Sequence, residues 1–353
     1  MKRTYPFKNL VFKGGGIKVF VYLGAIDVLE EVGILKQIKR VAGNSAGSIM
    51  ATILSFRLSM HETSRIFSTL DYSKISAFEA QEFPDGKHQP PKTLVEKGAK
   101  VKGGMTALNR LRTRYGLFSS EVILNWLRET IASQCDGNDR ATFADFKQRG
   151  FRDLHIVATN ISKHKITEFS VNTTPQVQVA NAAMASCSIP FFFEALQFDG
   201  ERFGQGDFYA DGGVLTNYPI HIFDEDEYSV GNPFYEHGVN WETLGLRLFT
   251  PEECLEELTP ITNMPSYIRN LLATVASTED ASFEHTLVDR VRTINVSNCC
   301  VDTTDFTIKP GTEKYDEMLE AGRTATREFL EKYRAGTGKI AELKAKFSEF
   351  IDS

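Results

Sequence analysis

Residues 40–58 read RVAGNSAGSIMATILSFRL. A short strand-like run, Arg40-Val41-Ala42, leads into a Gly-rich turn, and an apolar stretch with helical spacing follows the turn. Residues 9–32 show the same order, with an apolar run, three consecutive glycines and a helical pattern. Two strand–turn–helix units in succession predict a parallel sheet with helices on its faces.

The same patterns predict the other elements of the chain. Further strands are predicted at 154–159, 165–171, 243–249 and 291–296. Further helices are predicted at 121–133 (capped by Ser119 or Ser120), 176–185 and 312–333. No repeat or linker divides the sequence, so one domain is expected over residues 1–335, followed by a peripheral helical tail at 336–353. The stretch 72–104, rich in Pro, Gly and Lys, is interpreted as either a lid or a surface insertion.

The composition is ordinary for a soluble globular protein, with 42% hydrophobic and 24% charged residues among 353. The formal net charge of −6 argues against a nucleic-acid partner, because nucleic-acid binding needs a basic face. The N-terminus lacks the pattern of a secretory signal peptide, and no apolar run is long enough to span a bilayer. A cytoplasmic protein with peripheral membrane contact is therefore expected, and delivery as a secreted effector stays open.

The five cysteines follow no CxxC pattern. Adjacent Cys299 and Cys300 are predicted to point to opposite faces of a strand, and this interpretation is favoured over a disulfide or a metal site. A reduced, intracellular protein follows from it. No acidic cluster has the spacing of an EF-hand, so neither a metal nor another cofactor is expected.

Ser45 is the candidate nucleophile, because Gly43-Asn44-Ser45-Ala46-Gly47 has the form G-x-S-x-G between a strand and a helix. A serine hydroxyl needs a base to take its proton and donors to hold the oxyanion. The flanking glycines let neighbouring backbone pass close to the serine, and the following helix points its N–H groups at the site.

Two other glycine-rich segments offer the remaining groups. Gly14-Gly15-Gly16 exposes several backbone N–H groups between a strand and a helix, as an oxyanion hole requires. A dinucleotide site is disfavoured, since the G-x-G-x-x-G frame runs into Val19, and no Gly-Lys-Ser/Thr follows as in a Walker loop. Asp211 precedes two glycines, a pattern that in isolation is typical of a turn.

Taken together, the ordered motifs resemble those of the patatin-like phospholipases. The matching blocks are Lys13-Gly14-Gly15-Gly16-Ile17-Lys18, the Ser45 turn, Ala185-Ser186-Cys187-Ser188-Ile189-Pro190-Phe191, and Asp211-Gly212-Gly213 with Asn217 and Pro219. Residues 301–306 and the helix after them also resemble C-terminal parts of bacterial members. The resemblance covers about residues 7–333.

This resemblance implies a three-layer α/β/α fold with a mostly parallel central sheet. It implies a lipid acyl hydrolase of the phospholipase A type, which cleaves fatty acyl esters of membrane phospholipids through an acyl-enzyme on Ser45. Asp211 would act as general base, without histidine or metal, and Lys18 would orient the loop or attract phosphate. The implied oxyanion donors are the backbones of Gly14, Gly15, Gly16 and Ile17, and the implied supporting residues are Gly43, Gly47, Gly212 and Gly213. An activating partner or ligand is left open.

Several alternatives remain at this point. The family has a glycine where this chain has Val19, which invites a catalytically weak lipid-binding module on the same fold. A thioesterase or acyltransferase would use the same acyl-enzyme. An α/β-hydrolase triad could combine Ser45 and Asp211 with His237 or His285, but that fold places more strands before its nucleophile than this sequence does.

Overall fold

The computed structural model describes residues 5–75, 109–254, 286–303 and 305–335, and nine single positions between 261 and 283. Within these residues, a central sheet of eight strands has the order β12-β11-β1-β2-β4-β8-β7, with β5 paired to β4. The strands are β1 (Asn9–Phe12), β2 (Arg40–Asn44), β4 (Asp153–Asn160), β5 (Lys165–Ser170), β7 (Leu196–Phe198), β8 (Asp207–Asp211), β11 (Thr243–Phe249) and β12 (Thr293–Ser297). The five strands from β12 to β4 pair in parallel, whereas β5, β7 and β8 pair antiparallel.

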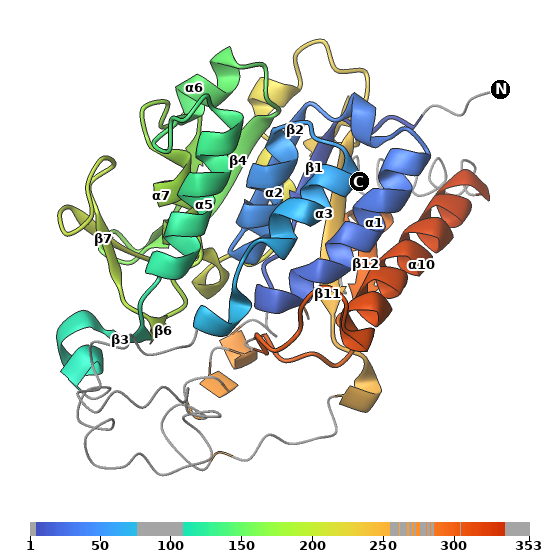
Figure 1. Cartoon of the computed structure of the whole chain (residues 1–353). Helices are drawn as coiled ribbons and strands as arrows, with labels where there is room; N and C mark the ends of the chain where they lie inside the picture. The colour runs from blue at the N-terminus through green and yellow to red at the C-terminus, as the bar shows by residue number, and fades with distance from the viewer. Residues whose placement is uncertain are drawn as a thin grey trace.

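Helices flank this sheet, as Figure 1 shows for α1, α2 and α10 in front of the parallel strands. The α-helices are α1 (Phe20–Glu31), α2 (Ala46–Ser55), α3 (Met60–Ser68), α5 (Glu121–Gln134), α6 (Phe143–Gln148), α7 (Val179–Ser186), α9 (Leu287–Val291) and α10 (Glu313–Ala335). On the other side of the sheet, the 3-10 helix η6 (Ile220–Phe223) packs on Val11 and Ala42 in a second apolar cluster. The predicted α/β architecture with a mostly parallel central sheet is thus confirmed.

The parallel strands are buried on both faces, as expected when helices cover both sides of a sheet. All four residues of β1 are buried, and so are residues 41–44 of β2. This explains why both strands are short apolar runs in the sequence rather than alternating patterns. Every strand and helix predicted above between residues 9 and 333 has its counterpart within the described residues, with bounds that differ by a few positions.

Strand β4 brings together two segments that lie far apart in the chain. Its residues 153–157 pair with β2 and its residues 158–160 pair with β8. Strand β5 pairs with residues 155–160, so it must occupy the opposite edge of β4. Strands β2 and β8 therefore lie end to end along one edge of β4, and their ends meet where Asn44 faces Val157 and Asp211 faces Ala158.

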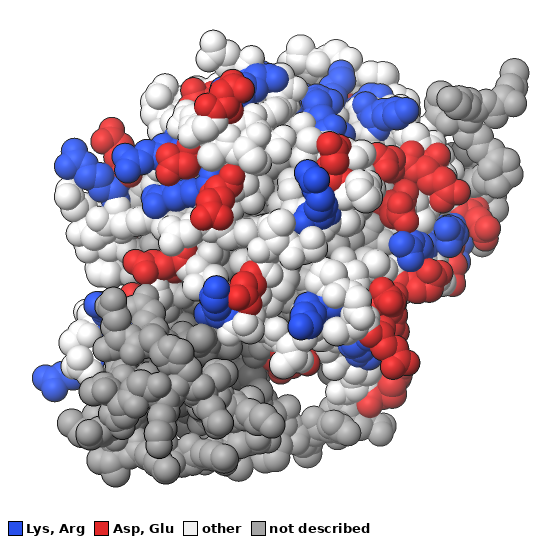
Figure 2. Space-filling model, viewed as in Figure 1, with Lys and Arg blue, Asp and Glu red and all other residues white. Residues whose placement is uncertain are grey.

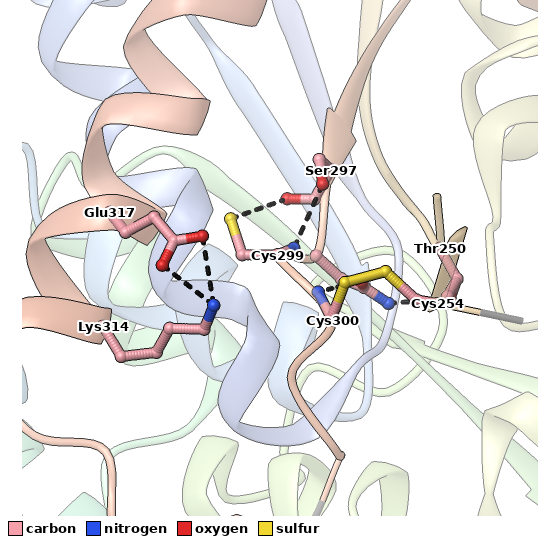
Figure 3. The surroundings of a disulfide bond; sticks show 8 residues. Thr250, Cys254, Ser297, Cys299, Cys300, Lys314 and Glu317 are labelled. Atoms are coloured by element: carbon pink, nitrogen blue, oxygen red, sulfur yellow. Dashed lines mark hydrogen bonds and ion pairs between the residues drawn. A yellow bond between two sulfur atoms is a disulfide. The ribbon is translucent and has the colours of Figure 1, made fainter. Parts of the chain in front are cut away.

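The expectation for the cysteines was wrong. Strand β12 ends at Ser297, and Cys299 and Cys300 follow in a turn where both have positive φ. Cys300 forms a disulfide with Cys254, with a Cα–Cα distance of 5.5 Å, as Figure 3 shows. The two cysteines do not alternate across a strand, because the backbone has left the sheet before it reaches them. The prediction of a fully reduced protein is overturned with that placement.

Acidic side chains gather along α10 at one side of the molecule, as Figure 2 shows. The exposed acidic residues of this helix are Glu313, Asp316, Glu317, Glu320, Glu328 and Glu331. Its apolar stripe packs against α1 and β12, which makes the helix amphipathic as predicted. Among the described residues, no helix is both long and apolar enough to cross a membrane.

Two predicted features lie outside the described residues. These are the tail at 336–353 and the greater part of the stretch 72–104, of which only the 3-10 helix η3 (Tyr72–Lys74) and Ile75 are described. The lid-or-insertion interpretation and the peripheral tail stay predictions.

Candidate active site

Ser45 lies in the turn between β2 and α2, with φ 51° and ψ −133°. This region of the Ramachandran plot is sparsely populated for residues with a side chain, and such strain concentrates at functional sites. The turn is tight because backbone fills the space beside its glycines. A Cβ on Gly43 would lie 2.2 Å from the carbonyl oxygen of Gly47, and one on Gly47 would lie 2.7 Å from that of Phe12.

Asp211 ends β8 and reaches Ser45 because β2 and β8 meet along β4. Its Oδ1 atom accepts the amide N–H of Gly213 at 2.8 Å and the Nδ2–H of Asn44 at 3.2 Å. The Ser45 side chain also lies near enough to this carboxylate to favour its charged form. Both side chains are almost fully buried, with relative exposures of 6% for Ser45 and 7% for Asp211.

Burial raises the pKa of Asp211 above the usual aspartate value, because the charged form loses its hydration. The neighbouring Ser45 side chain opposes this rise, and the hydrogen bonds from Gly213 and Asn44 do so too. A buried carboxylate with a raised pKa beside a serine hydroxyl has the character of a general base.

The glycine loop lies directly beside Ser45. A Cβ on Gly14 would lie 3.0 Å from Ser45 Cβ, so glycine leaves room for the nucleophile. The amide of Gly14 donates to the Asn217 carbonyl at 3.0 Å, and that of Ile17 donates to the Thr303 carbonyl at 3.2 Å. Among the described residues, the amides of Gly15 and Gly16 have no hydrogen-bond partner. Of the four predicted oxyanion donors, these two are therefore the ones with an N–H to offer.

The lysines that flank the loop are held differently. Lys13 is buried, and its ammonium group forms an ion pair with Asp280. Burial lowers the pKa of Lys18, and the nearby charge of Asp302 opposes that effect. Lys18 belongs to the 3-10 helix η1 (Gly16–Val19), which connects the glycines to α1.

An apolar cavity opens at Ser45. Its walls come from η1, α3, α5 and the segments around Ile189 and Phe306, and nearly all of the lining is aliphatic or aromatic. Val19 is 5% exposed and forms part of this wall, where it packs with Phe20 in the main core. The departure from the family glycine therefore places a side chain in the apolar lining.

Three residues at the site received no role from the sequence. Asn44 contacts Asp211, and Ser186 Oγ accepts the backbone N–H of Ser45 at 2.8 Å. Cys187 lines the cavity, and burial raises its pKa far above the usual thiol value, so its sulfur stays a neutral thiol. All three lie inside the motif blocks, and that position was the only indication in the sequence that they belong to the site. A single sequence does not show which way a side chain points.

Of the two histidines in the triad alternative, the structure describes only His237. His237 is exposed in the turn between β9 (Tyr235–Glu236) and β10 (Val239–Asn240). His221 hydrogen-bonds to Asp224 and Asp289, both at 3.0 Å. His285 lies outside the described residues. In the described part of the chain, no group of three or more His, Cys, Asp or Glu side chains is arranged to hold a metal ion.

Comparison with known proteins adds independent information. The family model described as patatin-like phospholipase matches residues 10–224. An uncharacterized protein of Acanthamoeba polyphaga mimivirus is 27% identical over 75% of this chain and 74% of its own length. A probable lipid hydrolase of Invertebrate iridescent virus 6 is 29% identical over 61% of this chain and 63% of its own length. The crystal structure of VipD from Legionella pneumophila superposes with a TM-score of 0.55 at 20% identity, over 94% of this chain and 68% of that one.

Proposed function

The chain belongs to the patatin-like phospholipase family, and on that premise we propose that it hydrolyses fatty acyl esters of membrane phospholipids through a Ser45–Asp211 dyad. One observation carries this proposal. The Ser45 side chain lies beside the buried carboxylate of Asp211 and lines an apolar cavity. A polar reaction centre beside an apolar cavity suits an ester that bears a long acyl chain.

In the proposed reaction, Ser45 Oγ attacks the carbonyl carbon of the ester and its proton passes to Asp211. The carbonyl oxygen becomes an oxyanion, and the amides of Gly15 and Gly16 donate to it. The carbon–oxygen ester bond then breaks, and Asp211 returns the proton to the departing lysophospholipid oxygen. The fatty acyl group remains on Ser45 as an acyl-enzyme.

Water completes the cycle. Asp211 takes a proton from the water molecule as the water oxygen attacks the acyl carbon, and the Gly15 and Gly16 amides stabilise the second oxyanion. The bond to Ser45 Oγ breaks, the fatty acid leaves, and the proton returns to Ser45. The acyl chain lies in the apolar cavity, whose wall includes Ile49, Trp126 and Phe193.

The direct test is replacement of each member of the dyad. We expect Ser45→Ala and Asp211→Asn each to lower the hydrolysis of mixed phospholipid vesicles by at least about 10⁴-fold, because the two groups act as a unit. Lipid mass profiling would measure the release of fatty acid and lysophospholipid. Circular dichroism would show that the variants remain folded.

A fluorophosphonate probe provides the control. The probe should label wild-type protein on Ser45 and leave Ser45→Ala unlabelled. Treatment with a chelator should leave turnover unchanged, because the proposed steps use side chains and backbone amides. Normal turnover by Ser45→Ala would refute the assignment of the nucleophile.

A further inference from the structure

Asn44 joins the two halves of the candidate site through its side-chain amide. The residue is fully buried at the end of β2, immediately before Ser45. Its Nδ2 group donates one hydrogen to Asp211 Oδ1 at 3.2 Å and the other to Asn217 Oδ1 at 3.0 Å. Both hydrogens of the amide are therefore used, one toward the base and one toward the loop that follows it.

The oxygen end of the same amide is also fixed. Asn44 Oδ1 lies 3.2 Å from Ser186 Oγ, the hydroxyl that accepts the Ser45 amide and has the Val157 carbonyl as its nearer acceptor at 2.6 Å. A Cβ on Gly212 would lie 2.1 Å from Asn44 Oδ1, so the Asp211-Gly212 backbone passes directly over this atom. Reversal of the amide would turn its oxygen toward the carboxylate of Asp211, where two acceptors would repel each other. The orientation with Nδ2 toward Asp211 is thus the stable one.

These contacts give the two carboxylate oxygens of Asp211 different roles. Oδ1 accepts from both Gly213 and Asn44, which fills the acceptor positions of one carboxylate oxygen. The acceptor positions of Oδ2 remain for the Ser45 hydroxyl. Loss of the Asn44 donor would free the carboxylate to rotate and would remove a bond that favours its charged form.

The contact with Asn217 extends the same network to the glycine loop. The backbone carbonyl of Asn217 accepts the amide of Gly14, next to the Gly15 and Gly16 amides, which have no partner among the described residues. A Cβ on Gly14 would lie 2.4 Å from Asn217 Oδ1, so this side chain touches the loop as well. One amide group therefore connects the base to the loop that offers the oxyanion donors.

We propose that Asn44 is a positioning residue, which holds the Asp211 carboxylate with Oδ2 toward Ser45 and fixes its place relative to the Gly14–Gly16 loop. This role rests on the proposed function of Ser45 and Asp211. It concerns the chemical step rather than substrate binding, because Asn44 does not line the apolar cavity.

The test compares Asn44→Leu, Asn44→Asp and Asn9→Leu in the full chain. Asn44→Leu removes both donors, and Asn44→Asp removes them while it keeps the shape of the side chain. Asn9→Leu is the matched control, because Asn9 is also fully buried and hydrogen-bonded to a side chain, at the opposite end of the sheet. Initial rates on a soluble p-nitrophenyl acyl ester would be measured from acidic to alkaline pH, together with labelling of Ser45 by a fluorophosphonate.

For both Asn44 variants we expect kcat at neutral pH to fall on the order of ten- to a hundredfold, because a hydrogen bond to a charged group is lost. KM should stay close to the wild-type value. The acid limb of the rate profile should move to higher pH, and further for Asn44→Asp, since two neighbouring carboxylates raise each other's pKa. Labelling of Ser45 should recover at alkaline pH, which a misfolded variant would not do. Asn9→Leu should keep the wild-type profile.

The outcomes separate this inference from the proposed function. Wild-type labelling at Ser45 together with an unshifted acid limb in both Asn44 variants would overturn the positioning role alone. Asn44 variants that stay unlabelled at every pH would also overturn it, because the role requires that an ionised Asp211 restores reactivity. Absence of both labelling and turnover in wild-type protein would overturn the proposed function, and this inference with it.

Discussion

The backbone of Ser45 has an unfavourable conformation that contacts with the surrounding residues hold in place. A residue with a side chain held in such a sparsely populated region costs on the order of 1–3 kcal/mol, and Ser45 has φ 51°. The Ser45 amide compensates by donating to Ser186 Oγ, while α2 begins at the next residue. Ser45 lines the apolar cavity at the point where β2 passes into α2.

Gly16 is the glycine of the loop that we expect to tolerate substitution least. It has φ +59°, and an added Cβ would lie 2.2 Å from the Thr303 carbonyl, which accepts the neighbouring Ile17 amide. Gly16→Ala should displace the loop and lower the rate of Ser45 acylation by about 10²-fold or more, as the loss of an oxyanion donor does. Stopped-flow measurement with a chromogenic ester would give that rate.

Gly33 provides a matched control for backbone strain. It also has positive φ (+82°), but nothing lies within 4 Å of an added Cβ. Gly33→Ala should lose about 1–2 kcal/mol of stability from the left-handed conformation and keep the wild-type acylation rate. Equal effects of the two substitutions on acylation would contradict a specific role for Gly16.

At the scale of elements, short strands of the sheet were the hardest to predict. The runs 9–12 and 243–249 are apolar because both faces of these strands are buried, and their bounds were predicted as the structure has them. Strand β8 was missed, since Asp207–Asp211 mixes acidic and aromatic residues between glycines and has the composition of a turn. Its strand character comes from its pairing with β4, a contact that no local pattern in the sequence encodes.

The disulfide between Cys254 and Cys300 links the segment after β11 to the turn after β12. It closes a loop with a sequence separation of 46 residues, which in the chain-entropy model stabilises the fold by up to about 4 kcal/mol. We therefore expect Cys300→Ser, or treatment with dithiothreitol, to lower the midpoint of thermal unfolding. Differential scanning calorimetry with and without the reductant would measure the change.

Cys299→Ser is the appropriate comparison, because Cys299 is free and lies next to the bonded cysteine. This variant should still respond to dithiothreitol as the wild type does, whereas Cys300→Ser should show no further response. A thermal midpoint that is insensitive to the reductant in wild-type protein would contradict a stabilising role for the bond.

At the scale of the whole molecule, His221 should make stability depend on pH. Hydrogen bonds to Asp224 and Asp289 raise the pKa of His221 from 6.5 to about 9. A group whose pKa is raised on folding stabilises the protein fully when the pH is below its pKa in the unfolded chain. This stabilisation is lost as the pH rises through its pKa in the folded protein. We expect the thermal midpoint to fall between about pH 6.5 and about pH 9. The change should be modest, because solvent screens this largely exposed ring.

Two substitutions check the assignment to this histidine. His221→Gln should flatten the pH dependence over that range, and His61→Gln, at an exposed position on α3, should leave it unchanged. Thermal shift assays in matched buffers would give the curves. Parallel curves for the wild type and His221→Gln would show that another group is responsible.

Much of the candidate site was predictable because its residues lie in ordered motifs. Ser45 and the glycine loop come directly after predicted strands. Because β1 and β2 pair in parallel, their carboxyl ends bring these two segments side by side. The approach of Asp211 was given only by resemblance, since it depends on the antiparallel docking of β8. The side-chain directions of Asn44 and Ser186 depend on tertiary packing, so they were not predictable from the sequence. The hydrogen bond that occupies the Ile17 amide also depends on tertiary packing.

With Asp211 as the proposed base of Ser45, the end-to-end meeting of β2 and β8 on β4 would also determine when during synthesis the protein becomes reactive. Asn44 and Asp211 are separated by 167 positions, and contacts between distant segments form late because a long loop must close first. During synthesis, Ser45 leaves the ribosome well before Asp211, its proposed base. We expect ribosome-bound chains that end before Asp211 to show no labelling by fluorophosphonate, whereas released full-length chains are labelled. The nascent chain would thus remain harmless to the membranes around it until its synthesis has passed β8.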